Sequence, residues 1–130
     1  MAQKIFLVSG ATDGIGRVTA TELARAGGQV ILVGRDRAKA ERVVDRIKRD
    51  SGNQQVGFEV TDLSSQSDIR ALAARLNDRL VHLDVLVNNV GAWFQRRHLS
   101  VDGIEMTFAL NHLGYFLLIG LLLEKLKSAP

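Results

Sequence analysis

The fold is decided by the stretch Ile5-Phe-Leu-Val-Ser-Gly-Ala-Thr-Asp-Gly-Ile-Gly16. It begins as a short apolar run of the kind that forms a buried strand, and it then breaks into three glycines, Gly10, Gly14 and Gly16. Glycines let the backbone turn sharply and approach a ligand closely, while the free N–H groups and positive dipole end of a following helix attract an anion. The stretch therefore predicts a strand, a phosphate-binding turn and a helix. The spacing is not G-x-G-x-x-G, so the glycines alone do not identify the ligand.

The rest of the chain continues to alternate between strand-like and helix-like segments. Strands are expected at residues 5–9, 30–33, 56–60 and 85–87, and helices near residues 14–26, 37–50, 69–80 and 104–127. Apolar strands separated by single helices imply a parallel sheet that is covered by helices on both faces. The expected fold class is therefore α/β, a doubly wound parallel sheet of the Rossmann type.

Composition narrows the classes of function. With 46% hydrophobic and 24% charged residues, the chain has the makeup of one soluble globular domain. It contains no cysteine, and its three histidines, His82, His98 and His112, are scattered, so we expect no metal site. The basic residues between Arg35 and Arg49 alternate with apolar ones at helical spacing. This pattern indicates the solvated face of a helix, and we expect no nucleic-acid partner.

The most apolar stretch, Leu113–Leu123, has 11 residues, whereas a helix needs roughly 20 to cross a bilayer. We therefore expect a buried or interface helix and no membrane span. Because this helix is apolar on nearly every side, it is either buried within one chain or shared with a second copy. Residues 104–127 are thus the candidate surface for a homo-oligomer. The N-terminus lacks the apolar segment and cleavage site of a secretory signal, which predicts a cytoplasmic protein.

Four short features come at the ends of the expected strands. They are Ser9–Gly16, Gly34-Arg35-Asp36, Asp62-Leu63 and Asn88-Asn-Val-Gly91. On these features the chain resembles the N-terminal half of the short-chain dehydrogenase/reductase family, so that residues 1–130 would be the N-terminal part of a dinucleotide-binding domain. The stretch Asp102–Leu118 is similar to the retinol-dehydrogenase-like branch. The resemblance implies an oxidoreductase that transfers a hydride between a nicotinamide and a small-molecule alcohol or carbonyl substrate.

The resemblance also implies roles for individual residues. The pyrophosphate turn would be formed by Gly10, Thr12, Asp13, Gly14, Ile15 and Gly16. The adenine would lie beside Asp62 and Leu63, and the nicotinamide-side ribose beside Asn89, Val90 and Gly91. Asn111 would be the catalytic asparagine, whose backbone carbonyl holds a water in the proton relay. Purely structural interpretations remain open, since glycines occur at any strand-to-helix turn, aspartates often precede helix caps, and a buried asparagine is usually hydrogen-bonded within the core.

Arg35 indicates which nicotinamide cofactor to expect. The tip of the second strand is where the adenosine ribose lies in such folds, and an acidic group there would bind its 2′-hydroxyl. This chain has Gly34 and Arg35 instead, and a guanidinium binds a 2′-phosphate through paired charge-assisted hydrogen bonds. NADP is therefore favoured over NAD, with Arg17 and Arg37 as weaker phosphate ligands. The alternative is that Arg35 is a surface residue at the start of a basic helix.

The serine, tyrosine and lysine of the family's chemistry lie downstream of the long helix. The single tyrosine here, Tyr115, belongs to that helix and has Ile119 four residues on, where the family's motif has a lysine. The chain therefore resembles a cofactor-binding half truncated after the fourth strand and the following helix, and we expect it to be inactive alone. The alternative is an inactive truncated homologue that binds NADPH or a partner. A coding sequence that continued past Pro130 into a Tyr-x-x-x-Lys motif would favour the enzyme.

Overall fold

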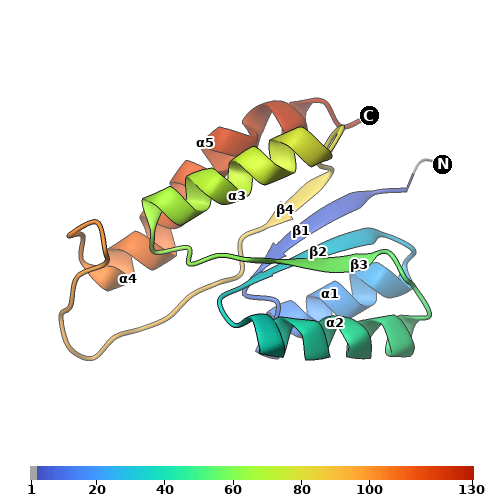
Figure 1. Cartoon of the computed structure of the whole chain (residues 1–130), viewed down its shortest axis with the longest axis horizontal. Helices are drawn as coiled ribbons and strands as arrows, with labels where there is room; N and C mark the ends of the chain where they lie inside the picture. The colour runs from blue at the N-terminus through green and yellow to red at the C-terminus, as the bar shows by residue number, and fades with distance from the viewer. Residues whose placement is uncertain (1–2) are drawn as a thin grey trace.

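The computed structural model describes residues 3–130, which form a four-stranded parallel sheet in the order β3-β2-β1-β4 (Figure 1). The strands are β1 (Ile5–Ser9), β2 (Gln29–Gly34), β3 (Val56–Val60) and β4 (Val85–Val87). The central strand β1 places Leu7 in register with Ile31 of β2 and Leu86 of β4. The doubly wound parallel sheet expected from the sequence is confirmed.

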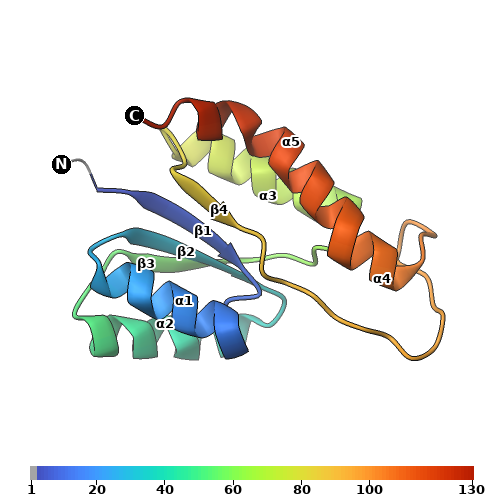
Figure 2. The same cartoon turned by 180° about the vertical axis from the view of Figure 1, so that it is seen from behind.

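Helices cover both faces of this sheet (Figures 1 and 2). One face carries α1 (Gly14–Arg25) and α2 (Arg37–Ser51), and the other carries α3 (Gln66–Arg79) and α5 (Gly114–Lys127). Because successive side chains of a strand point to opposite faces, β1 contributes to two separate cores. Val8 packs beneath α1 and α2, whereas Leu7 packs beneath α3 and α5.

Side-chain caps define where the first three helices begin. Asp13 Oδ1 accepts the Gly14 N–H at 2.8 Å, Asp36 Oδ1 accepts the Lys39 N–H at 3.0 Å, and Ser65 Oγ accepts the Asp68 N–H at 3.4 Å. Each bond pairs a backbone donor that the first helical turn leaves without an intrahelical acceptor. The N-termini of α1, α2 and α3 therefore lie at the edge of the sheet where β1, β2 and β3 end.

The long C-terminal helix differs from the uninterrupted helix expected over residues 104–127. It begins with one turn, α4 (Met106–Phe108), widens into a π-helical segment, η1 (Ala109–Leu113), and continues as α5. A Cβ on Gly114 would overlap the Leu63 carbonyl oxygen, so this glycine allows the helix to lie directly against the segment that follows β3. Apolar spacing does not reveal such a local widening, because it adds no characteristic residue pattern.

The same helix bears on the expectation that the chain has no membrane span. Within the described residues, Met106–Lys127 is 22 residues long, and an 18-residue window of it has a mean hydropathy of 1.7 with 28% of the window buried, so this helix is long and apolar enough to cross a bilayer. Core helices of soluble proteins meet the same criterion, and here Leu118 and Leu122 are fully buried against α3. The absence of a membrane span therefore stays a prediction.

An irregular segment connects β4 to α4. It extends far from the sheet and then returns toward α3 and α4 (Figures 1 and 2). Its return is anchored by Asp102, whose Oδ2 accepts the Gln66 N–H at 2.9 Å, and by a bridge between Leu99 and Glu105. The returning end of the segment is thus attached to the start of α3.

Candidate functional site

A cavity of about 190 Å³ lies at the carboxyl ends of the strands. The residues predicted as cofactor ligands that line it are Gly10, Thr12, Asp13, Arg35, Leu63, Val90 and Gly91. This is the edge of an open parallel sheet at which ligands bind. Four segments that are distant in sequence therefore converge on one site.

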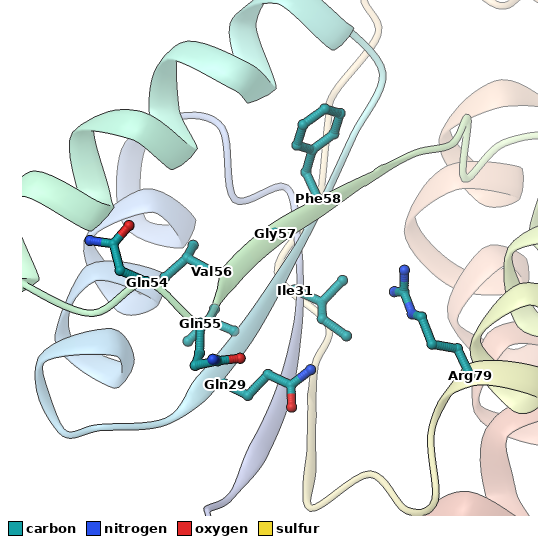
Figure 3. A pocket seen from close by; sticks show the side chains of 9 residues that line it. Gln29, Ile31, Gln54, Gln55, Val56, Gly57, Phe58 and Arg79 are labelled. Carbon is teal, nitrogen blue, oxygen red and sulfur yellow. The ribbon is translucent and has the colours of Figure 1, made fainter.

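A larger cavity, of about 270 Å³, lies at the opposite end of β2 and β3 (Figure 3). Its polar lining comes from Gln29, Gln54, Gln55 and Arg79, and none of the predicted ligands is present. Arg79 is already paired there with the buried Glu59, since its guanidinium lies 3.0 Å from Glu59 Oε1. The smaller cavity is the candidate site, because it combines the predicted residues with the helix N-termini.

The glycine turn is packed so closely that it excludes side chains. Gly10 has φ +62°, and a Cβ at this position would lie 2.9 Å from Val90 Cα. A Cβ on Gly16 would overlap both the Gly10 carbonyl oxygen and Asn89 Nδ2. The turn is therefore a backbone-lined cradle of the kind that a pyrophosphate requires.

Asn89 holds this turn against the end of β4. Its Nδ2 donates to the carbonyl oxygens of Ser9 and Gly10 at 3.2 and 3.1 Å, and its backbone N–H donates to Ser9 Oγ at 3.0 Å. Asn89 is not among the residues that line the cavity, so the structure supports its role in fixing the sheet. Ser9 is fully buried and completes the network, although a serine at a strand end gives no specific signal in the sequence.

The remaining residues of the glycine turn lie at the start of α1. Gly14 has φ +46°, and its N–H donates to Asp13 Oδ1, which caps α1. Ile15 is 79% exposed on the first turn of the helix. Neither residue lines the cavity, so any contact with a ligand would be made at its rim.

The sequence predicts that Asp62 and Leu63 bind the adenine together, but their two side chains have different surroundings. Asp62 Oδ1 accepts the Ser64 N–H at 2.9 Å and the Ser64 hydroxyl at 2.7 Å, which forms a local turn before α3. Leu63 is buried and lines the cavity, whereas Asp62 does not. The contacts of Asp62 therefore match the structural interpretation, in which it prepares the start of a helix.

Thr61 lines the cavity and was not singled out from the sequence. Its side-chain oxygen is buried and has no hydrogen-bond partner within residues 3–130, and the same is true of Asn88 Oδ1. Buried polar atoms are normally paired, so an unpaired one at a cavity is a reason to expect a ligand or water there. Together with the glycine cradle, this fits a bound dinucleotide.

Asn111 lies in the π-helical segment and binds the backbone beside the cavity. Its Oδ1 accepts the Ala92 N–H at 2.9 Å, and its Nδ2 donates to the Ala92 carbonyl oxygen at 2.7 Å. Ala92 and Leu110 both line the cavity. The side chain thus has a structural task, which is to fix the backbone of Ala92 beside the cavity.

Asn111→Ala should lower the free energy of unfolding by about 2 kcal/mol, because it removes two hydrogen bonds and leaves part-buried Ala92 groups without partners. Urea unfolding followed by circular dichroism measures this loss. His112→Ala, at the exposed next position, is the control and should change stability by less than about 0.5 kcal/mol. Equal effects for the two variants would contradict the assignment of Asn111 as the residue that fixes Ala92.

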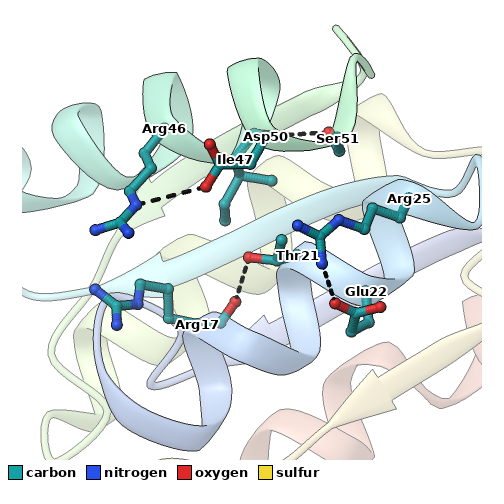
Figure 4. Close-up of polar contacts among 8 residues, drawn as sticks. All are labelled: Arg17, Thr21, Glu22, Arg25, Arg46, Ile47, Asp50 and Ser51. Atoms are coloured by element: carbon teal, nitrogen blue, oxygen red, sulfur yellow. Dashed lines mark hydrogen bonds and ion pairs between the residues drawn. The ribbon is translucent and has the colours of Figure 1, made fainter.

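The three arginines considered for the 2′-phosphate have different surroundings. Arg35 is exposed at the cavity, and within the described residues it has no ion-pair partner. The guanidinium of Arg37 lies 5.5 Å from the centre of the Phe58 ring. Arg17 lines a groove between α1 and α2 together with Arg46 (Figure 4). Only Arg35 is a lining residue of the candidate site.

The charge of Asp13 at this site is stabilised by its neighbours. Lys39 Nζ donates to Asp13 Oδ2 at 2.9 Å and, with the Gly14 N–H, holds the pKa of the Asp13 carboxyl below its usual value. Asp13 is therefore ionised at neutral pH, close to where phosphates would bind. The positive charges of Lys39 and Arg17 offset this carboxylate and so reduce its repulsion of an anion.

Comparison with known proteins agrees with this geometry. The family model described as short chain dehydrogenase matches residues 4–130. The chain belongs to the short chain dehydrogenase family. Human retinol dehydrogenase 11 is 48% identical over 98% of this chain and 40% of its own length, and human polyprenol dehydrogenase is 41% identical over 97% and 38%. The chain thus spans about 40% of the length of curated short chain dehydrogenases such as these.

Solved structures of the family share the architecture. The Pseudomonas aeruginosa RhlG/NADP complex superposes with a TM-score of 0.84 at 33% identity, over 100% of this chain and 51% of that protein. An alcohol dehydrogenase from Thermococcus sibiricus, complexed with 5-hydroxy-NADP, gives a TM-score of 0.83 at 26% identity over 97% and 54%. Both of these solved structures thus share the fold of the short chain dehydrogenase described here.

Proposed function

We propose that the chain is the cofactor-binding part of an NADP-dependent oxidoreductase, which transfers a hydride between the nicotinamide and an alcohol or carbonyl substrate. The observation that carries this proposal is Arg35, which lines the cavity beside Gly34 at a position where an acidic residue would select NAD. The structural neighbours in complex with NADP and 5-hydroxy-NADP support the same choice of cofactor.

The cofactor would supply the hydride, and the residues of this chain would bind and orient it. The first turn of α1 would hold the pyrophosphate through backbone N–H groups, and Arg35 would bind the 2′-phosphate. Gly10 would give the pyrophosphate room, because its own N–H donates to the Val33 carbonyl oxygen at 3.1 Å. Leu63 would pack against the adenine, and Val90 and Gly91 would lie along the nicotinamide-side ribose. Asn111 would position a water through its carbonyl group.

Proton transfer to the substrate would depend on residues outside this chain. Burial raises the pKa of the Tyr115 hydroxyl, which is the opposite of what a phenol needs for proton transfer near neutral pH. We therefore expect the chain alone to bind cofactor without turnover. The second candidate is an inactive homologue that serves as an NADPH-binding or partner-binding module.

The names of the relatives suggest a substrate class. Relatives named retinol dehydrogenase and polyprenol dehydrogenase favour an alcohol, or the matching carbonyl compound, as the substrate of the whole protein. We also propose that it is cytoplasmic and that copies associate through residues 104–127. Exposed apolar side chains on α5, with Phe116 74% exposed and Ile119 40% exposed, support such an association.

Cofactor preference tests the proposal directly. NADPH should bind the chain at least about tenfold more tightly than NADH, because a charge-assisted hydrogen bond to a phosphate contributes on the order of 1.5–3 kcal/mol. Arg35→Leu should weaken NADPH binding about tenfold and leave NADH binding unchanged. The single tryptophan, Trp93, follows Ala92 at the cavity, so its fluorescence can report both titrations.

Arg49→Leu is the control for this experiment, because Arg49 is exposed near the far end of α2. It should leave both affinities unchanged. Equal affinities of the unmodified chain for NADPH and NADH would contradict the proposed NADP dependence.

A further inference from the structure

Lys39 brings a second positive charge to the rim of the candidate site. It lies in the first turn of α2, and its ammonium group crosses to the glycine turn, where Nζ donates to Asp13 Oδ2 at 2.9 Å. Asp13 lines the same cavity as Arg35. A residue from a different helix is thereby held beside the place proposed for the cofactor phosphates.

The other basic residues near this edge have different surroundings. Arg37, two residues before Lys39, lies over the Phe58 ring at 5.5 Å. Arg17 lies along the groove between α1 and α2 with Arg46, whose Nε is 3.5 Å from Asp50 Oδ2 (Figure 4). The charge of Arg17 also stabilises the ionised Asp13, but Lys39 is the residue that forms an ion pair with this lining residue of the candidate site.

The two oxygens of Asp13 have separate tasks. Oδ1 caps α1 by accepting the Gly14 N–H at 2.8 Å, whereas Oδ2 pairs with Lys39. The Asp13 side chain is 77% exposed, and an ion pair in such a place contributes little to stability because water screens it. A phosphate dianion forms stronger charge-assisted bonds with an ammonium group than one screened carboxylate does. Lys39 can therefore leave Asp13 at small cost.

We propose that Lys39 is a second determinant of specificity for the 2′-phosphate and that it exchanges Asp13 for this phosphate when NADP binds. Asp13 then has two opposing effects: it holds Lys39 at the site before binding, and it competes with the phosphate for the same ammonium group. The inference rests on the proposed function, because it requires that the cofactor carry a 2′-phosphate.

Titrations of the full chain with NADPH and NADH test the exchange. Lys39→Met should weaken NADPH binding about tenfold and leave NADH binding nearly unchanged, since the two cofactors differ only in the 2′-phosphate. Lys39→Gln should do the same, because it also removes the charge. Lys48→Met, in the last turn of the same helix, is the control and should change neither affinity. Circular dichroism melts verify that each variant is folded.

Asp13→Asn tests the competition, because asparagine keeps an oxygen that can cap α1 but carries no charge. In a chain that keeps Lys39, Asp13→Asn should release the Lys39 ammonium group. The affinity for NADPH should then rise about threefold more than the affinity for NADH. In the Lys39→Met background this extra gain should disappear. The inference is overturned if Lys39→Met leaves NADPH binding unchanged while Arg35→Leu weakens it, a result that preserves the proposed function. Equal binding of NADPH and NADH by the unmodified chain would overturn both.

Discussion

Gly16→Ala should lower the free energy of unfolding by about 3 kcal/mol or more and abolish NADPH binding. The added methyl group would overlap the Gly10 carbonyl oxygen and Asn89 Nδ2, and both belong to the closely packed turn at the candidate site. Backbone cannot move aside as the end of a flexible side chain can. Either α1 shifts away from the turn or the hydrogen bonds of Asn89 are lost, so the cradle for the pyrophosphate is deformed in both cases. Urea unfolding and cofactor titration measure the two effects.

Gly120→Ala is the matched control, since Gly120 is also a helical glycine but a Cβ there would have no atom within 4 Å. This change should raise stability by about 0.5–1 kcal/mol, because alanine is the better helix former. If both variants altered stability alike, the close approach of α1 to the turn would be wrong.

Leu118→Ala should lower the free energy of unfolding by about 3 kcal/mol, through lost burial and the cavity that it leaves. Leu118 is fully buried on α5, in one cluster with Leu72 and Leu76 of α3. The substitution therefore measures how firmly α5 is docked on the sheet through α3. Chemical denaturation of the unmodified and substituted chains gives the difference directly.

Leu123→Ala, on the same helix, provides the comparison. Leu123 is 40% exposed, so its truncation should cost less than about 1 kcal/mol. A cost similar to that of Leu118→Ala would mean that both faces of α5 are buried in solution, as in a self-associated form. A small cost for both would mean that α5 is not docked as described.

The strands and helices could be predicted from the sequence because their signals are local. The expected strands at 5–9, 56–60 and 85–87 have the bounds of β1, β3 and β4, since each is rich in β-branched or aromatic residues. The beginnings of the helices were less exact, since the helix expected near residues 69–80 begins at Gln66 as α3. The π-helical segment could not be predicted, because it reflects contacts of Asn111 and Gly114 with distant backbone.

The candidate site was predictable only in part, for the same physical reason. The sequence shows directly where glycines occur that can approach other backbone closely. It also shows that Arg35 follows the second strand, where a chain that binds NAD would have an acidic residue. The side chain of Asp62 turns to its own neighbour Ser64, which no sequence pattern distinguishes from an adenine contact. The pairing of Lys39 with Asp13 joins residues on two helices and depends on how these helices are placed by the sheet.

The strand order β3-β2-β1-β4 has a consequence for the order in which the molecule folds. Along β1, Ile5 pairs with Gln29 of β2, whereas Phe6 pairs with Val85 of β4. The pairing with β2 therefore closes a short loop of chain, and the pairing with β4 closes a much longer one. Loop-closure entropy makes the longer one costlier by roughly 1 kcal/mol. On the ribosome, β1, β2 and β3 with α1 and α2 can assemble before β4 has been synthesised. Until then the second edge of β1 stays available to other chains, which makes its pairing with β4 the step most exposed to aggregation.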